Sequence, residues 1–109
     1  MREWSRRTAG SGITFAAMHP GWADTPGLAE SLPGFHRRMR WALRTPAEGA
    51  DTIVWLATAP ARDVEDGRLY LDHRPRPFDL VPSTRLSAAG RRRLWSMVVE
   101  MTGGPDPLG

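Results

Sequence analysis

The sequence predicts an α/β fold, and three of its stretches carry that prediction. Residues 13–18 (ITFAAM) are apolar almost throughout and rich in β-forming side chains, as in a strand that is buried on both faces. Residues 45–58 begin with a helix-capping pattern and continue with apolar residues at helical spacing. Residues 68–72 (RLYLD) are short, largely apolar and bounded by turn signals, which favours a second strand. A strand, a helix and a strand in this order form a βαβ unit, so we expect Ile13–Met18 and Arg68–Asp72 to be adjacent parallel strands.

The helix between these strands is the most definite local prediction. Thr45 can accept hydrogen bonds from the first free N–H groups, Pro46 suits the first helical position, and Glu48 completes a capping box. A proline at position 60 closes the helix, which we place from Pro46 to about Thr58, packed across the strands. The apolar side chains that recur at helical spacing are Ala50, Ile53, Val54 and Ala57.

Further helices are predicted on both sides of this unit. Residues 2–9 have a helical composition and end at Gly10-Ser11-Gly12, which permits left-handed backbone. Residues 26–44 indicate a loop and a short amphipathic helix with its apolar face at Phe35, Met39 and Ala42 or Leu43. Ser87 caps a last helix, and residues 103–109 are predicted to be a flexible tail. The apolar stripe of the last helix consists of Leu94, Met97, Val98 and Met101.

Residues 72–77 cannot continue a central strand. They contain Pro75 and Pro77, and each proline removes a hydrogen-bond donor from the ladder of a sheet.

Composition bounds the class of protein. A chain of 109 residues makes one small domain at most, which buries roughly 60–70 % of its unfolded surface. Cysteine is absent, so neither disulfides nor thiolates contribute. No apolar run approaches the roughly 20 residues of a membrane span, and the Arg-rich start lacks the apolar segment of a signal peptide. We therefore expect a cytoplasmic protein without a membrane partner.

The residues after the first strand are the candidate binding site. His19 to Gly27 read HPGWADTPG, in which Pro20 and Gly21 end the strand and two polar side chains follow. Open α/β sheets bind ligands at the carboxyl ends of such strands. Thr25 has two interpretations, because its hydroxyl suits either a ligand or the cap of a helix that begins at Pro26. The residues alone favour neither.

The same residues carry a resemblance to the short-chain dehydrogenase/reductase (SDR) superfamily. Residues 13–27 resemble its sixth strand and the following loop, where a Pro-Gly and a Thr four residues after the Gly lie beside the nicotinamide of NAD(P). Residues 45–58 (TPAEGADTIVWLAT) resemble the helix after the substrate loop, and residues 67–75 (GRLYLDHRP) resemble the seventh strand. The resemblance is strongest to the group called dehydrogenase/reductase SDR family member twelve. It covers about residues 2–100, but only the C-terminal third of an SDR.

This resemblance implies the C-terminal part of a Rossmann-type, doubly wound parallel sheet, incomplete in itself, with residues 26–44 as the substrate lid. The cofactor would be NAD or NADP. Met1 would then stand in mid-helix, just after the position of the catalytic pair. The implied cofactor-binding residues are Pro20, Gly21, Trp22, Ala23 and Thr25.

The resemblance also implies what the chain lacks. The SDR reaction uses a Tyr and a Lys four residues later, whereas this chain has Tyr70 alone, no Lys, and no Gly-rich phosphate loop. Arg cannot replace a Lys whose pKa must shift. We therefore predict no catalytic residues, doubtful cofactor binding and no turnover by the chain alone. We expect either self-association or a partner that supplies the N-terminal half of the fold.

A second hypothesis is a small stand-alone interaction or nucleic-acid-binding protein. All 15 basic residues are Arg, with clusters at residues 37–44 and 91–93, and five Trp suit adhesive surfaces. Net charge is only +3, however, and no zinc finger or RNA-binding motif is present, so nucleic acid is the less favoured partner.

No metal site is predicted. His19, His36 and His73 share no spacing with each other or with a set of carboxylates. Asp24 and Glu30 are too far apart for a carboxylate pair, and we expect both to be solvated.

Overall fold

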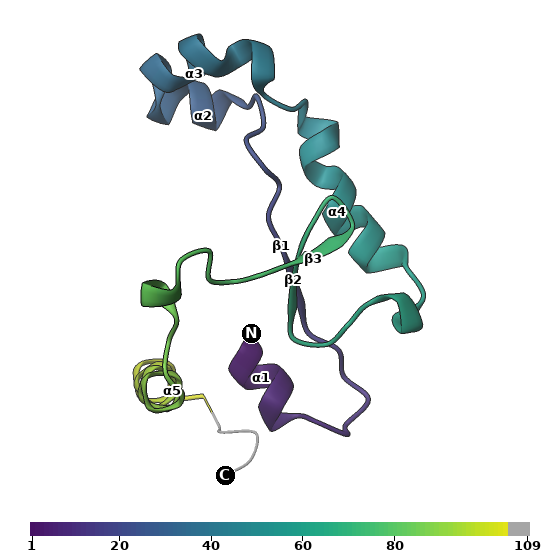
Figure 1. Cartoon of the computed structure of the whole chain (residues 1–109), viewed down its shortest axis with the longest axis vertical. Coiled ribbons are helices and arrows are strands. Elements are labelled where there is room, and N and C mark those ends of the chain that lie inside the picture. The colour runs from purple at the N-terminus through teal and green to yellow at the C-terminus, as the bar shows by residue number, and fades with distance from the viewer. Residues whose placement is uncertain (105–109) are drawn as a thin grey trace.

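The computed structural model describes residues 1–104, which form helices around a small sheet (Figure 1). The helices are α1 (Arg2–Arg7), α2 (Pro26–Ser31), α3 (Pro33–Met39), α4 (Pro46–Thr58) and α5 (Ala88–Thr102). The strands are β1 (Ala16–Met18), β2 (Arg68–Leu71) and β3 (Arg74–Arg76). Single 3-10 turns occupy Arg40–Ala42, Ala61–Asp63 and Pro82–Thr84. Of the predicted tail at 103–109, residues 105–109 lie outside the described residues.

The three strands form one sheet in the order β1-β2-β3. β1 and β2 are parallel, with Met18 opposite Tyr70, which confirms the predicted pairing, although the first strand begins at Ala16 rather than at Ile13. The Gly67 N–H donates to the Phe15 carbonyl at 2.8 Å, and the His19 N–H donates to the Tyr70 carbonyl at 2.9 Å. Backbone pairing therefore extends one residue beyond each end of β1.

β3 was not predicted, and it makes the sheet mixed rather than wholly parallel. It pairs antiparallel with β2, so that Pro75 lies opposite Tyr70. Asp72 and His73 turn the chain with φ of +53° and +59°, the left-handed backbone of a two-residue hairpin turn. Proline excludes a central strand but is tolerated on an edge strand, which is where β3 lies.

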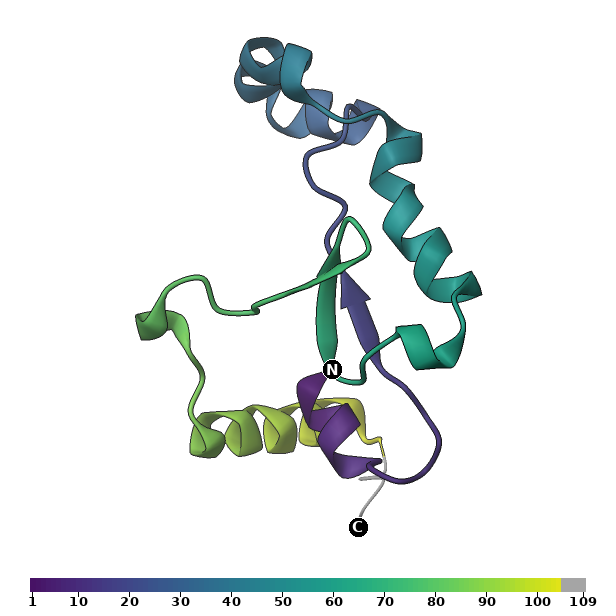
Figure 2. The same cartoon turned by 45° about the vertical axis from the view of Figure 1, so that its right-hand side comes forward.

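α4 has the predicted bounds and the predicted cap. The Glu48 N–H donates to Thr45 Oγ1 at 3.2 Å, and the Thr45 N–H donates to Glu48 Oε2 at 2.7 Å. The helix lies beside the two parallel strands (Figure 2), and Trp55 packs against Tyr70 with ring centroids 5.4 Å apart. The four apolar side chains at helical spacing remain exposed, with Ile53 at 54 % and Val54 at 58 % of their surface.

The core is small for a chain of this length. Among residues 1–104 the buried hydrophobic side chains are Tyr70, which is 1 % exposed, and Trp95, which is 7 % exposed. The chain exposes 8211 Å², whereas a compact monomer of this mass exposes roughly 6000 Å². Its radius of gyration is 17.0 Å, against about 13 Å for a compact domain of similar length. The expected burial is therefore not reached, and β1, predicted to be buried on both faces, is partly exposed along its length.

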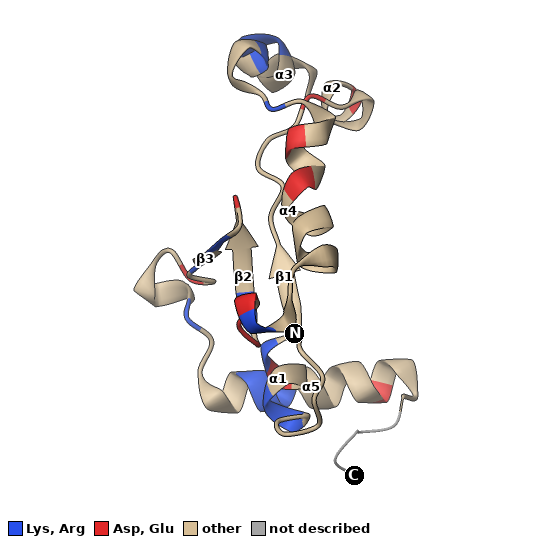
Figure 3. Ribbon diagram, turned by 90° about the vertical axis from the view of Figure 1, so that its right-hand side faces the viewer, with Lys and Arg blue, Asp and Glu red and all other residues tan. Residues whose placement is uncertain are grey.

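The helices outside the βαβ unit lie at the two ends of the parallel strands (Figure 3). α2 and α3 lie beyond the carboxyl ends, and α1 and α5 lie near the amino ends, where Trp4 contacts Phe15 at 5.9 Å and Trp95 at 4.9 Å between ring centroids. α5 begins at the predicted Ser87 cap, but it buries Trp95 and leaves the predicted stripe of residues 94, 97, 98 and 101 exposed. None of the helices in the described part of the chain is long and apolar enough to cross a membrane.

Candidate functional site

The loop after β1, residues 19–25, forms the floor of a pocket of about 470 Å³. We call these residues the site loop, and residues 26–44 the lid. All five predicted cofactor-binding residues line this pocket: Pro20, Gly21, Trp22, Ala23 and Thr25. The start of α2 contributes Gly27 and Leu28, and the start of α4 contributes Pro46 and Gly49. The pocket therefore lies where the carboxyl end of β1 meets the beginnings of two helices.

Thr25 caps α2. Its Oγ1 accepts a hydrogen bond from the Leu28 N–H at 3.2 Å, and Pro26 occupies the first helical position. A hydroxyl that accepts one hydrogen bond still has a proton to donate and a second lone pair. The capping interpretation is therefore correct, and the ligand interpretation remains compatible with it.

The end of the lid fastens the site loop through its backbone. The Arg44 N–H donates to the Trp22 carbonyl at 2.9 Å, and the Asp24 N–H donates to the Arg44 carbonyl at 2.7 Å. These two bonds form an isolated parallel bridge between Ala23 and Arg44. Gly49 of α4 supports the same loop, because a Cβ at that position would lie 3.1 Å from Ala23 Cβ.

The middle of the lid fastens the site loop through side chains. His36 Nε2 lies 2.6 Å from Asp24 Oδ1, and the rings of Trp22 and Phe35 are 4.8 Å apart. Asp24 therefore has a partner that was not expected, while its side chain remains 44 % exposed. The predicted short helix of the lid is α3, with the predicted apolar positions 35, 39 and 43 half-buried, whereas the predicted loop before it contains a further helix, α2. Site loop and lid thus form one connected unit.

An ion pair joins this unit to the hairpin between β2 and β3. Arg44 Nη1 lies 2.5 Å from Asp72 Oδ1, and Nη2 lies 2.9 Å from Oδ2, the two parallel contacts of a guanidinium fork. The hydrogen bonds from Arg44 lower the pKa of the Asp72 carboxyl, and the same contact raises the pKa of Arg44. Sequence reasoning missed this pair, because the two residues lie 28 positions apart and no local pattern connects them.

The remaining candidates have structural partners. Tyr70 is buried on β2, where its hydroxyl accepts the Glu65 N–H at 2.7 Å. His19 Nδ1 accepts the Gly21 N–H at 2.9 Å, and His73 Nε2 lies 2.7 Å from Asp51 Oδ2. Within residues 1–104, the metal-binding side chains form no group of three or more.

The two Arg clusters do not form a common surface. Arg37, Arg38 and Arg40 belong to α3 and the turn after it, whereas Arg92 and Arg93 belong to α5. Figure 1 shows α3 and α5 at opposite ends of the molecule.

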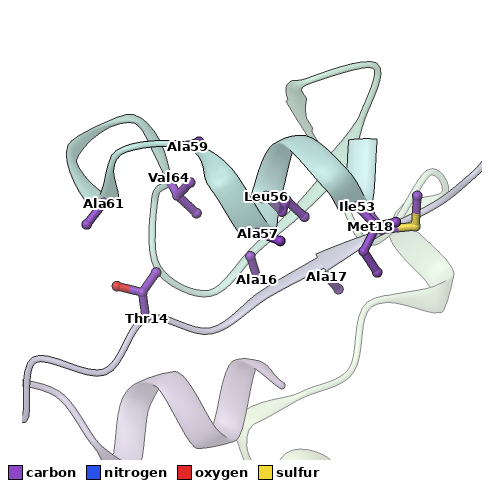
Figure 4. A pocket seen from close by; sticks show the side chains of 10 residues that line it. All are labelled: Thr14, Ala16, Ala17, Met18, Ile53, Leu56, Ala57, Ala59, Ala61 and Val64. Atoms are coloured by element: carbon purple, nitrogen blue, oxygen red, sulfur yellow. The ribbon is translucent and has the colours of Figure 1, made fainter. Parts of the chain in front are cut away.

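A second pocket, of about 630 Å³, lies between β1 and α4 (Figure 4). We call it the β1 edge pocket. Its lining is almost wholly apolar and consists of Thr14, Ala16, Ala17, Met18, Ile53, Leu56, Ala57, Ala59, Ala61 and Val64. In the described part of the chain β1 pairs with β2 alone, so this pocket adjoins an edge of the sheet that no strand covers.

The known proteins that are similar to this chain include several dehydrogenases. Bovine dehydrogenase/reductase SDR family member 12 is 43 % identical over 100 residues, which is 90 % of this chain and 31 % of the relative. The human protein of the same name is 50 % identical over 64 residues, 58 % of this chain and 20 % of the relative. Human retinol dehydrogenase 14 is 31 % identical over 111 residues, 94 % of this chain and 31 % of the relative. No family model matches the chain, and no solved structure matches it significantly. The chain spans at most about a third of the length of these relatives.

Proposed function

Because this chain matches the C-terminal part of a short-chain dehydrogenase/reductase, we propose that it forms the nicotinamide-side loop and the substrate lid of an NAD(P)-dependent oxidoreductase. The observation that carries the proposal is the pocket on the site loop. It gathers all five residues that the resemblance implied, at the carboxyl end of β1 and against the lid.

The chemistry of this pocket fits a nicotinamide. The ring is flat and bears a neutral amide, so it requires apolar walls and a few hydrogen-bonding groups rather than a charge. Pro20, Trp22 and Leu28 supply apolar surface, and Thr25 supplies a hydroxyl with a proton to donate. When bound, NAD(P)H supplies the hydride. The role of this chain would be to orient the carboxamide with Thr25 and to cover the site with the lid.

Proton transfer to a carbonyl substrate requires groups from outside these residues. Tyr70 is buried and bound to the Glu65 N–H, and the 109 residues contain no Lys. We therefore expect no turnover by the chain in isolation.

The partner that this function needs is the dinucleotide-binding part of an SDR, and its place is the β1 edge pocket. Phe15 and His19 direct backbone groups to β2, and successive residues of a strand alternate in direction. Ala16 and Met18 therefore direct their N–H and C=O groups to the uncovered edge. A strand added there would satisfy those groups and bury the apolar lining of the pocket.

A chimera tests the proposal. The corresponding third of the bovine relative is replaced by this chain, and binding of NADH and NADPH is measured by energy transfer from Trp to the reduced nicotinamide. We expect the chimera to bind one of the two cofactors. Loss of one hydrogen bond is worth about 0.5–1.5 kcal/mol, so Thr25→Ala is expected to weaken binding about 2- to 12-fold.

Two further variants separate the cap from the ligand. Thr25→Ser keeps both the cap and the proton and should bind like the parent. Thr25→Asp caps α2 but has no proton to donate, and should bind weakly. Failure of the chimera to bind either cofactor, or full binding by Thr25→Ala, contradicts the proposal. Turnover by the isolated chain contradicts the need for a partner.

A further inference from the structure

Gly21 of the site loop is fitted to the side chain of Arg44. Its φ is +76°, in the left-handed region that favours glycine. A Cβ at this position would lie 2.8 Å from Arg44 Nε and 3.0 Å from Cζ, which is closer than side chains pack. The guanidinium also approaches the Pro20 carbonyl at 3.5 Å. The Arg44 side chain thus lies directly against the backbone of the site loop, in addition to the backbone bridge between Arg44 and Ala23.

The far end of Arg44 is bound to a carboxylate on a fixed hairpin. Asp72 and His73 are both non-glycine residues with positive φ, a conformation that persists where the surroundings determine it. The His73 ring stacks on Trp55 at 4.9 Å with an interplanar angle of 13°, and its Nε2 is paired with Asp51 of α4. The hairpin is therefore held on α4, and it presents the Asp72 carboxylate to Arg44 from a fixed position.

Neither Arg44 nor Asp72 lines the pocket on the site loop. Both act on it through Pro20 and Gly21, which do. Resting on the proposed function, we propose that Arg44 and Asp72 are positioning residues of the nicotinamide pocket, and that their ion pair fixes the site loop in the shape that binds the cofactor.

The fork geometry makes the identity of both residues matter. Lys carries the same charge as Arg but has no planar pair of donors, so it cannot reproduce the two contacts. Asn keeps the shape of Asp and its tolerance of left-handed backbone but loses the charge. Arg44→Lys and Asp72→Asn therefore remove the fork while leaving the fold of the hairpin and the backbone bridge in place.

The test uses the 109-residue chain within the bovine chimera and two measurements. Hydrogen exchange at the Gly21 and Asp24 amides reports the order of the site loop without cofactor, and energy transfer reports cofactor binding. We expect Arg44→Ala, Arg44→Lys and Asp72→Asn each to speed exchange at these amides and to raise the cofactor Kd about two- to fivefold, which is the range that a partly exposed ion pair can supply. The melting temperature should change little, because the pair is half-exposed, at 32 % and 50 % of its side chains.

The control is Arg68→Ala, which removes an ion pair of comparable exposure to Glu65, 2.9 Å apart and remote from the site loop. It should leave both measurements unchanged. Unchanged loop exchange in the Arg44 and Asp72 variants overturns the positioning role, as does full cofactor binding by Arg44→Lys. A parent chimera that binds no cofactor while the variants still loosen the loop overturns the proposed function and upholds the positioning of the loop.

Discussion

At one edge of the sheet β3 presents Arg74, Pro75 and Arg76, whereas at the other edge β1 presents Ala16, Ala17 and Met18. Proline lacks an N–H and arginine carries a charge, and both features discourage the addition of a further strand. β1 has neither feature, and the apolar β1 edge pocket lies beside it. The composition of the two edges thus differs: β3 discourages a further strand, and β1 does not.

The two edges also differ in what holds them. β3 belongs to a hairpin that is fixed by Arg44, Trp55 and Asp51. β1 has β2 on one side and an open pocket on the other. In the described residues the β3 edge is therefore held in place by side chains of other elements, whereas the β1 edge is open.

The largest expected effect of this asymmetry is on the chain in isolation. Burying a large apolar side chain contributes roughly 1.5–3 kcal/mol, and a whole domain is stable by about 5–15 kcal/mol. Exposed side chains such as Trp41, Leu80 and Met101 forgo much of that contribution. We expect association and a broad thermal transition, measured by light scattering with size exclusion and by circular dichroism. A strict monomer with a sharp cooperative melt would show that the chain folds stably with the β1 edge uncovered.

Two proline substitutions should separate the outer from the inner side of β1. Ala16→Pro removes an N–H that points to the uncovered edge, so the sheet should persist while association weakens about tenfold, a loss of about 1.4 kcal/mol. Ala17→Pro is the matched control, since its N–H points to β2 and the sheet itself should be lost. Light scattering and circular dichroism measure the two effects. Equal association by the parent and Ala16→Pro would show that the chains associate through a surface other than the β1 edge.

Replacing the arginine and proline that protect the β3 edge should make this edge as open to pairing as the β1 edge. Arg74→Val with Pro75→Val restores an N–H and removes a charge, so we expect association to begin at a severalfold lower protein concentration. Arg85→Val, a change of the same kind in an exposed turn, serves as the control. If the double variant and this control associate alike, edge composition is not what separates the two strands.

Acid should loosen the segment just before β1, and we expect this effect to be smaller than those of the substitutions above. Asp66 accepts hydrogen bonds from the Ser5 hydroxyl at 2.5 Å and the Phe15 N–H at 2.7 Å, and these bonds lower its pKa below the ordinary 3.8. The stabilisation is therefore complete above pH 3.8 and is lost as the pH falls through the lowered pKa of the folded state. The Phe15 amide resonance should shift over that range. Asp66→Asn should abolish the titration, and a persistent shift in that variant would assign it to another group.

Local signals were predictable from the sequence, and contacts between distant residues were not. The bounds of α4 follow from Thr45, Pro46 and Glu48, which act within one turn. The apolar stripes of α4 and α5 could also be identified from the sequence, but not what covers them: Ile53 and Leu94 are each 54 % exposed in the described chain. β3 was missed because the rule that excludes proline applies to central strands.

In the site, too, the local residues were predictable from the sequence and their distant partners were not. The five residues of the site loop were identified by resemblance and lie together in one pocket. The side chains that fix this loop, from His36, Arg44 and Asp72, are separated from it along the sequence by a dozen to about fifty residues. Only the folded chain brings them to it.

The stacking of His73 on Trp55 also gives the molecule an intrinsic optical probe. A ring stacked on an indole shields that face from water, and an indole that becomes hydrated emits at longer wavelength. Trp55 fluorescence therefore reports whether the hairpin is seated on α4, with no label attached. Trp22 and Trp41 are 55 % and 86 % exposed and also emit, so the signal of Trp55 is isolated as the difference in emission between the parent and Trp55→Phe. This difference allows the seating of the hairpin, and with it the position of Asp72, to be followed in real time.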